Sequence, residues 1–232
     1  MEKTVLLRSI ERSAALQRWY DRLVPLIAGA QDRLRQVSPS RLIQRTGCAQ
    51  DPDGSLRLCL FWQEYQIQLP AFSVHRMYSS AQIDIGQQPS DFTQALILTY
   101  LVSADGTPPS GPWITYRDLP GGMFYAQAFH GYAELPLVRE LGKDGLQAFR
   151  RAAERLGGDS VELGNATYAF QVLPRVRLAA VYWQGDEELE SQASILFEGT
   201  APHYLSTDGL AVLGSHLVSA ILTASNADET RP

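Results

Sequence analysis

The N-terminal part of the chain has the hydrophobic periodicity of an amphipathic helix. Its apolar residues recur at three- and four-residue steps, with arginine and glutamine between them: Leu16, Trp19, Tyr20, Leu23, Ile27, Ala30 and Leu34. This spacing predicts a helix over residues 8–37. Pro25 should kink or divide it, because proline lacks a backbone donor and clashes with the preceding turn. Ser38 and Pro39 then predict the start of a short helix that runs to Arg45, where Thr46-Gly47 stops it.

The pattern changes to alternation after residue 50. A turn at residues 51–54 is followed by alternating or continuous apolar positions at 56–61 and 65–69, which predicts a β-hairpin. A further extended segment is expected at residues 72–76. Ser90 is placed to cap a helix from Asp91 to about Ser103. Since this helix is apolar on most faces, we expect it to be buried.

The second half of the chain reads as helices and a meander of strands. A Pro- and Gly-rich loop over residues 105–112 precedes residues 113–116 and a turn at residues 119–122. Helices are predicted near residues 123–130 and 145–156, and strands at 167–173, 177–183 and 193–197. Gly131 and Pro136 are expected to interrupt any helix between His130 and Glu134. A closing helix is predicted from Ser206 or Thr207, with a core stripe of Leu210, Leu213, Leu217, Ile221 and Ala224. This order predicts an α+β fold with a mainly antiparallel sheet, helices packed on it and a single compact core. We expect one domain over residues 1–225 and a polar tail over 226–232.

Composition places the chain among ordinary globular proteins. Of its 232 residues 45% are hydrophobic and 19% are charged. The longest apolar stretch, residues 95–102, is far shorter than a membrane span, and Met1–Thr4 lacks the pattern of a signal peptide. With only Cys48 and Cys59, no four-cysteine site can form. We therefore expect a cytoplasmic protein without membrane contact, both thiols reduced and Cys59 in the core.

Charge is distributed unevenly. Residues 1–50 hold nine basic and four acidic side chains, a net charge of +5, whereas the remainder holds eleven and twenty-one, a net charge of −10. The basic side chains lie at helical spacing: Arg8, Arg12, Arg18, Arg22, Arg33, Arg35, Arg41 and Arg45. They form either a docking surface for an acidic protein partner or the solvated face of amphipathic helices. Trp19 and Tyr20 fall on the apolar stripe, which argues against nucleic-acid stacking.

An acidic turn precedes the last predicted strand. Asp186, Glu187, Glu188 and Glu190 would suit a hard cation, which prefers converging carboxylate oxygens. A calcium loop places its ligands at alternate positions, however, and these residues are mostly consecutive. Neighbouring side chains on an extended segment point to opposite sides. The turn is therefore interpreted as a solvated hairpin tip, and no metal site is predicted.

His203 is the histidine best placed to act as a base or a metal ligand. It precedes the closing helix, and it would reach Asp186 or Glu188 if the late strands pair. Such a carboxylate–histidine pair acts as a base or as half of a metal site. The alternative is a histidine that binds the backbone at the junction of loop and helix.

Three further groups are candidates for ligand binding. Gly121 and Gly122 precede a helix and can present backbone N–H groups to an anion, with Arg117 nearby to add charge. The same Pro-Gly-Gly sequence is typical of a plain turn. Arg175 and Arg177 flank one residue on an extended segment, so they share a face and either clamp an anion or pair with the acidic turn. Trp183 ends the strand that leads to that turn.

Several motifs occur together in a fixed order: Trp113-Ile114, Arg117 to Gly122, Leu173-Pro174-Arg175, Tyr182-Trp183 with Gly185 to Glu188, Leu196 to Glu198, and His203-Tyr204-Leu205. This set of motifs resembles one uncharacterised family, a domain of unknown function found mostly in anaerobic bacteria and archaea. Some members of that family resemble fusions to an iron–sulfur domain of corrinoid proteins. This chain departs from them, because two cysteines cannot hold such a cluster.

These observations lead to three functional hypotheses. The first is a non-catalytic accessory or small-molecule-binding protein in anaerobic, corrinoid or one-carbon metabolism, which rests on the resemblance and on the absence of sequence motifs such as HExxH and GxSxG. The second is a metal-assisted hydrolase or transferase that uses His203 with Asp186 or Glu188. The third is a protein-interaction module that uses the arginine-rich N-terminal helices. No cofactor can be assigned.

Overall fold

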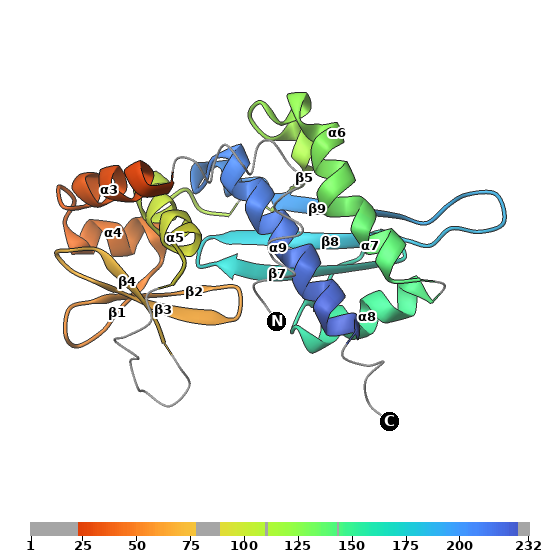
Figure 1. Cartoon of the computed structure of the whole chain (residues 1–232), viewed down its shortest axis with the longest axis horizontal. Coiled ribbons are helices and arrows are strands. Elements are labelled where there is room, and N and C mark those ends of the chain that lie inside the picture. Colours follow the sequence, from red (N-terminus) through yellow and green to blue (C-terminus); the bar gives the residue numbers. More distant parts are fainter. Residues whose placement is uncertain (1–22, 78–88, 110, 143, 227–232) are drawn as a thin grey trace.

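The computed structural model describes residues 23–77, 89–109, 111–142 and 144–226. Two antiparallel sheets and the helices around them make up this part of the chain (Figure 1). The N-terminal elements are α3 (Leu23–Leu34), α4 (Pro39–Thr46), β1 (Ala49–Gln50), β2 (Leu56–Leu60), β3 (Gln63–Gln68), β4 (Ser73–Arg76) and α5 (Asp91–Ser103).

The C-terminal elements follow a loop after α5. They are β5 (Trp113–Thr115), the 3-10 turns η1 (Tyr116–Asp118) and η2 (Gly122–Phe124), α6 (Ala126–Phe129), the π-helical turn η3 (His130–Glu134), α7 (Leu135–Glu140), α8 (Gly145–Arg155), β6 (Asp159–Ser160), β7 (Ala166–Leu173), β8 (Val176–Trp183), β9 (Gln192–Glu198), the 3-10 turn η4 (Ala201–His203) and α9 (Thr207–Asn226). This inventory confirms the predicted α+β class.

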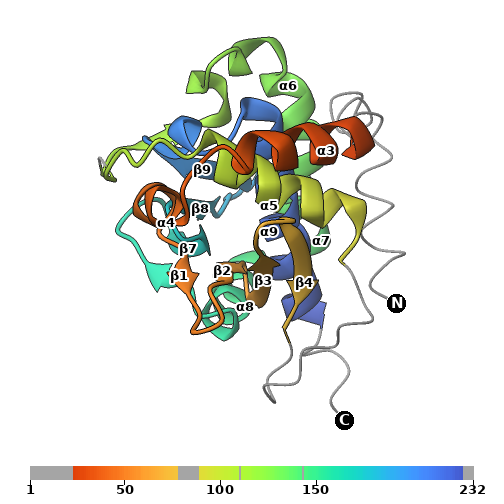
Figure 2. The ribbon, with the colours of Figure 1, turned by 90° about the vertical axis from the view of Figure 1, so that its left-hand side faces the viewer.

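The N-terminal sheet has the strand order β1-β2-β3-β4 and lies beneath α3 and α5 (Figure 1, Figure 2). Alternation along β2 explains which side chains enter the core: Leu56 and Leu58 are buried, whereas Arg57 and Cys59 point to the other face. The prediction that Cys59 is a core residue is therefore wrong. Cys48, just after α4, is the buried thiol, and burial raises its pKa to about 11.

The C-terminal sheet has the order β5-β9-β8-β7-β6, and α9, α7 and α8 cross one of its faces (Figure 1). Leu178, Ala180 and Tyr182 of β8 point toward these helices and join the main core, as the period of two requires. The intervening Ala179 and Val181 belong to a separate small cluster on the opposite face. One core runs through both sheets, as predicted.

The two halves of the molecule meet at the β2–β3 turn. Phe61 donates its N–H to the Val172 carbonyl of β7 at 2.8 Å, and Trp62 Nε1 donates to the Leu156 carbonyl after α8 at 2.8 Å. Phe61 also stacks on His216 of α9, with ring centroids 5.3 Å apart. These contacts tie the N-terminal sheet to the C-terminal one. The single-domain assignment of residues 1–225 stays a prediction.

Most predicted helices and strands are confirmed, including the Ser90 cap, which accepts the Thr93 N–H at 3.3 Å. One expectation is wrong. Gly131 and Pro136 were expected to interrupt the helix between His130 and Glu134, yet α6, η3 and α7 form one continuous helical segment. The π turn explains the difference, because Leu135 donates its N–H to His130, five residues earlier, directly before the proline.

The closing helix α9 is long and apolar enough to cross a membrane by length and composition alone. However, 61% of the most apolar 18-residue stretch of this helix is buried inside the protein. Its predicted stripe, Leu210, Leu213, Leu217, Ile221 and Ala224, is buried throughout. These properties are those of a core helix. The helix includes Asn226, the first residue of the predicted tail; residues 227–232 lie outside the described part.

Candidate functional site

The β8–β9 hairpin extends beyond the body of the C-terminal sheet (Figure 1). Its turn is held by Asp186, whose Oδ1 accepts the N–H groups of Glu188 and Leu189, each at 2.9 Å. These two bonds keep the pKa of Asp186 below its usual range. Gly185 is required here, because a Cβ would lie 2.1 Å from the Leu189 carbonyl oxygen. The carboxylate of Asp186 therefore builds the turn.

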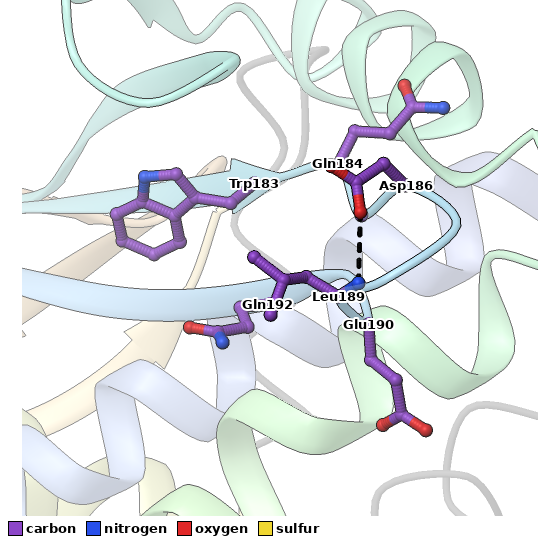
Figure 3. A pocket seen from close by; sticks show the side chains of 7 residues that line it. Trp183, Gln184, Asp186, Leu189, Glu190 and Gln192 are labelled. Atoms are coloured by element: carbon purple, nitrogen blue, oxygen red, sulfur yellow. Dashed lines mark hydrogen bonds between the residues drawn. The ribbon is translucent and has the colours of Figure 1, made fainter.

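A pocket of about 250 Å3 lies along this hairpin. It is lined by Trp183, Gln184, Gly185, Asp186, Leu189, Glu190 and Gln192. Figure 3 shows the Leu189 side chain turned back toward the Trp183 indole, whereas the Glu190 carboxylate points away from it. Gln192 is the cross-strand partner of Trp183, so the two side chains leave the same face of the sheet.

The indole of Trp183 packs against the loop that precedes β7. A Cβ on Gly164 would lie 3.0 Å from its Nε1, so the loop before β7 packs closely on the ring. Trp183 contacts the small cluster on the outer face of the sheet. The guanidinium of Arg177 lies on the same face, 5.9 Å from the Trp113 ring centroid and 3.3 Å from the Asp159 carboxylate. Arg177 thus pairs with Asp159 and not with the acidic turn.

Arg175 lies at the other end of β8, beside the C-terminal end of α4. A Cβ on Gly47 would lie only 3.2 Å from Arg175 Nε. Gly47 has a φ of 71°, the left-handed conformation that ends a helix. A cation at this position interacts favourably with the α4 dipole. Arg175 therefore does not share a site with Trp183.

His203 pairs with a carboxylate that the sequence did not indicate. Its Nδ1 lies 2.7 Å from Asp105 Oδ2 and 3.2 Å from Thr107 Oγ1. Hydrogen bonds from Thr107 and His203 lower the pKa of Asp105 to about 2. Tyr204 donates its hydroxyl to the Thr107 carbonyl. These contacts fasten the loop after α5 to the start of α9.

The structure therefore does not bring His203 to Asp186 or Glu188, the first of the two alternatives that the sequence left open. The acidic turn precedes β9 and His203 follows it. Seven residues of extended strand separate the two by about 20 Å. Among the residues that the structure describes, no group of three histidine, cysteine or acidic side chains is arranged to hold a metal ion. The geometry required by the metal-assisted hydrolase hypothesis is not present.

The Pro-Gly-Gly sequence forms a close-packed turn. Gly121 has a φ of 73°, and Gly122 donates its N–H to the Leu119 carbonyl at 2.8 Å. A Cβ on Gly122 would lie 2.0 Å from the Tyr116 carbonyl oxygen, so the second glycine is needed for close packing. Arg117 is exposed on η1.

The basic N-terminal surface is described only in part. Arg8, Arg12, Arg18 and Arg22 lie outside the described residues. Arg35 pairs with Asp32 at 2.6 Å, and Arg33 donates to the Gly29 carbonyl within its own helix at 3.2 Å. These local contacts fit the solvated face of an amphipathic helix.

Of the eight predicted site residues, the pocket brings together Trp183 and Asp186. Sequence reasoning did not predict Gln184, Gly185, Leu189 or Gln192 as lining residues, and it considered Glu190 only as a possible cation ligand in the acidic turn. Leu189 carried the one usable signal, since it is the single large apolar side chain within the acidic turn. Gln192 carried none, because its place follows from the register of β8 and β9.

The family assignment follows from a family model that covers most of the chain. The model of a domain of unknown function, DUF3786, matches residues 38–220. The chain belongs to the DUF3786 family. No curated protein and no solved structure matches the chain. The β8–β9 pocket and the His203–Asp105 pair lie within the matched residues. So do the contacts that the β2–β3 turn makes with β7, α8 and α9.

Proposed function

We propose that this DUF3786 protein is a non-catalytic, small-molecule-binding accessory protein whose ligand occupies the β8–β9 pocket. Leu189 carries this proposal. Its side chain is 67% exposed and turns toward the Trp183 indole (Figure 3), so an aliphatic and an aromatic surface face the same space. Covering a leucine side chain yields roughly 1.5–3 kcal/mol. A ligand that fills this space gains that free energy.

The lining of the pocket defines the chemistry of the ligand. A flat ring stacks on the indole and contacts Leu189, and the Gln192 side chain can both donate and accept a hydrogen bond. Complete ligand sites usually measure about 300–1,000 Å3. The pocket volume of about 250 Å3 therefore suits a small neutral heterocycle or one end of a larger molecule.

The test is ligand-observed NMR with a library of neutral one- and two-ring heterocycles. We expect Trp183→Ala and Leu189→Ala each to weaken binding about tenfold, which corresponds to about 1.4 kcal/mol. Glu188→Gln is the matched control, because Glu188 lies on the same turn but does not line the pocket. His203→Ala is a second control at the other end of β9.

Two results would overturn the assignment. Compounds that bind the wild type and both pocket variants equally place the site elsewhere. A library that shows no binding to the wild type removes the ligand-binding role. Circular dichroism and thermal melting of each variant show whether its fold is intact, so a loss of binding through unfolding is recognised.

We further propose that this role belongs to anaerobic metabolism in the cytoplasm, in corrinoid or one-carbon chemistry. The motif resemblance supports the metabolic setting, and two free cysteines fit a reducing compartment. Protein purified from its own host without oxygen should show the visible absorbance of a bound or co-purified corrinoid. A colourless preparation without such a partner would contradict the corrinoid link and leave the pocket test unaffected.

A further inference from the structure

His130, which begins the π turn between α6 and α7 (Figure 1), is held by a buried carboxylate at the edge of the C-terminal sheet. Its Nδ1 lies 2.8 Å from Glu134 Oε2. The other carboxylate oxygen, Oε1, accepts the Ser194 hydroxyl and the Ile195 N–H of β9, each at 3.0 Å. The Glu134 side chain is 9% exposed, whereas the His130 side chain is 43% exposed. A buried carboxylate thus fixes an imidazole that faces solvent.

The contact with Glu134 decides which ring nitrogen of His130 is free to react. A carboxylate accepts hydrogen bonds and donates none, so Nδ1 carries the proton, and Nε2 of the neutral ring carries the lone pair. Within the part of the chain that the structure describes, Nε2 has no hydrogen-bond partner and is accessible to solvent. The π turn runs from His130 to Glu134, and single π turns inside helices are frequent at functional sites. His130 therefore presents an oriented lone pair at the surface.

The residues around His130 indicate which ligand this lone pair takes. Residues 119–133 contain no Asp, Glu, Lys or Arg, so this stretch offers no cation to a phosphate or carboxylate substrate. In the described residues no three histidine, cysteine or acidic side chains lie together, whereas a bare transition-metal ion usually takes three or four protein ligands. A metal tetrapyrrole brings its equatorial nitrogens with it, and one axial imidazole is enough to hold the metal. A single oriented histidine in uncharged surroundings fits this last class.

We propose that His130 is the axial ligand of a metal tetrapyrrole, either a haem or a corrinoid. Nε2 replaces a water molecule on the metal, and the oxidation state of the metal does not change. Glu134 is a positioning residue, because its carboxylate fixes the tautomer and the direction of the ring. Gln127 and Gly131, which neighbour His130 on the helical segment, are exposed, and the absent side chain of Gly131 leaves room for a flat ring. The site shares no residue with the β8–β9 pocket.

The first test is absorbance titration of the full chain with haemin and, separately, with diaquocobinamide, a corrinoid without an axial base of its own. Exchange of axial water for imidazole shifts the visible bands, and we expect an equimolar shift with at least one of the two probes. The probe that binds identifies the ring. His130→Ala should abolish the shift. His203→Ala is the matched control and should keep it, since His203 is also half-exposed and also held by a carboxylate at Nδ1.

Glu134→Gln separates ligation from folding. The amide oxygen stays with the Ser194 and Ile195 donors, so the amide NH2 faces Nδ1, and the neutral ring then carries its proton on Nε2. We therefore expect the affinity for the probe to fall by about 10–100-fold, with the fold intact by circular dichroism. Wild-type affinity in Glu134→Gln would remove its positioning role.

Three results would overturn the proposal. They are no shift with either probe, a shift that survives in His130→Ala, and a shift that Leu189→Ala removes. The last result would place the ring in the β8–β9 pocket, which Leu189 lines. A failure at His130 alone leaves the heterocycle test of that pocket unaffected.

Discussion

Glu134 is a buried carboxylate that joins a helix to a sheet edge. Its Oε1 accepts the Ser194 hydroxyl and the Ile195 N–H, each at 3.0 Å, and its Oε2 lies 2.8 Å from His130 Nδ1. Strand β5 pairs with β9 only from Leu196 onward. Glu134 therefore takes up the Ile195 N–H just beyond the end of β5, where a buried donor would otherwise lack a partner.

Replacing Glu134 should destabilise the fold in proportion to the donors left unpaired. We expect Glu134→Ala to lower the free energy of unfolding by about 3 kcal/mol, because two inward-facing donors lose their acceptor. Glu134→Gln should cost about 1 kcal/mol, since the amide oxygen still accepts. Urea denaturation measures both values. Equal losses for the two variants would show that the negative charge of the carboxylate, and not an acceptor oxygen alone, is what the fold requires.

At the scale of elements, the turn between η1 and η2 shows how two adjacent glycines serve different purposes. Gly121 supplies a positive φ, and Gly122 supplies the absence of a side chain against the Tyr116 carbonyl. The Pro-Gly-Gly sequence identified the turn, but the close approach of η1 depends on the path of the chain through both 3-10 turns. This is why an anion site was a reasonable alternative from sequence.

Gly122→Ala should lower the free energy of unfolding by about 2–3 kcal/mol, because its Cβ would lie 2.0 Å from a backbone oxygen and the turn must shift. Gly29→Ala is the control. Gly29 lies within α3, no atom lies within 4 Å of its added Cβ, and alanine favours helix by about 1 kcal/mol. Thermal melting should give opposite signs for the two variants. A Gly122→Ala protein as stable as the wild type would contradict the close packing.

At the scale of the whole molecule, stability depends on the joint between the two sheets. His216 of α9 stacks on Phe61 of the β2–β3 turn. Burial lowers the pKa of His216 below its ordinary value of 6.5, so the imidazole is kept neutral in the folded protein. Protonation opposes the packing that joins the N-terminal sheet to the C-terminal helices.

This arrangement predicts a pH dependence of stability. The unfolded chain protonates His216 near pH 6.5, whereas the folded chain does so only at lower pH, so the unfolded state binds more protons between these values. The free energy of unfolding should therefore fall as pH decreases from 7 toward 5, by at most about 1.4 kcal/mol per pH unit for this group. In His216→Gln the slope should be flatter. An unchanged slope would assign the effect to other groups.

Local sequence determined the elements of this protein because their signals are local. The Ser90 cap, the Gly47 stop and the alternation in β2 each depend on neighbouring residues and on backbone geometry. They were sufficient to predict the α+β class and most boundaries. The same local reasoning wrongly predicted an interrupted helix at Pro136. A π turn before the proline, in which Leu135 donates its N–H to the His130 carbonyl, keeps the segment helical.

Only the tertiary structure decided which distant residues meet. Asp105 and His203 are 98 positions apart, and neither has a local feature that names the other. His203 and Asp186 are much nearer in sequence, yet they lie at opposite ends of β9 because an extended strand carries the chain away from its start. Register placed Gln192 beside Trp183, and the turn brought Leu189 back to the indole. Long-range contacts such as these arise from packing of the whole chain, which no short pattern encodes.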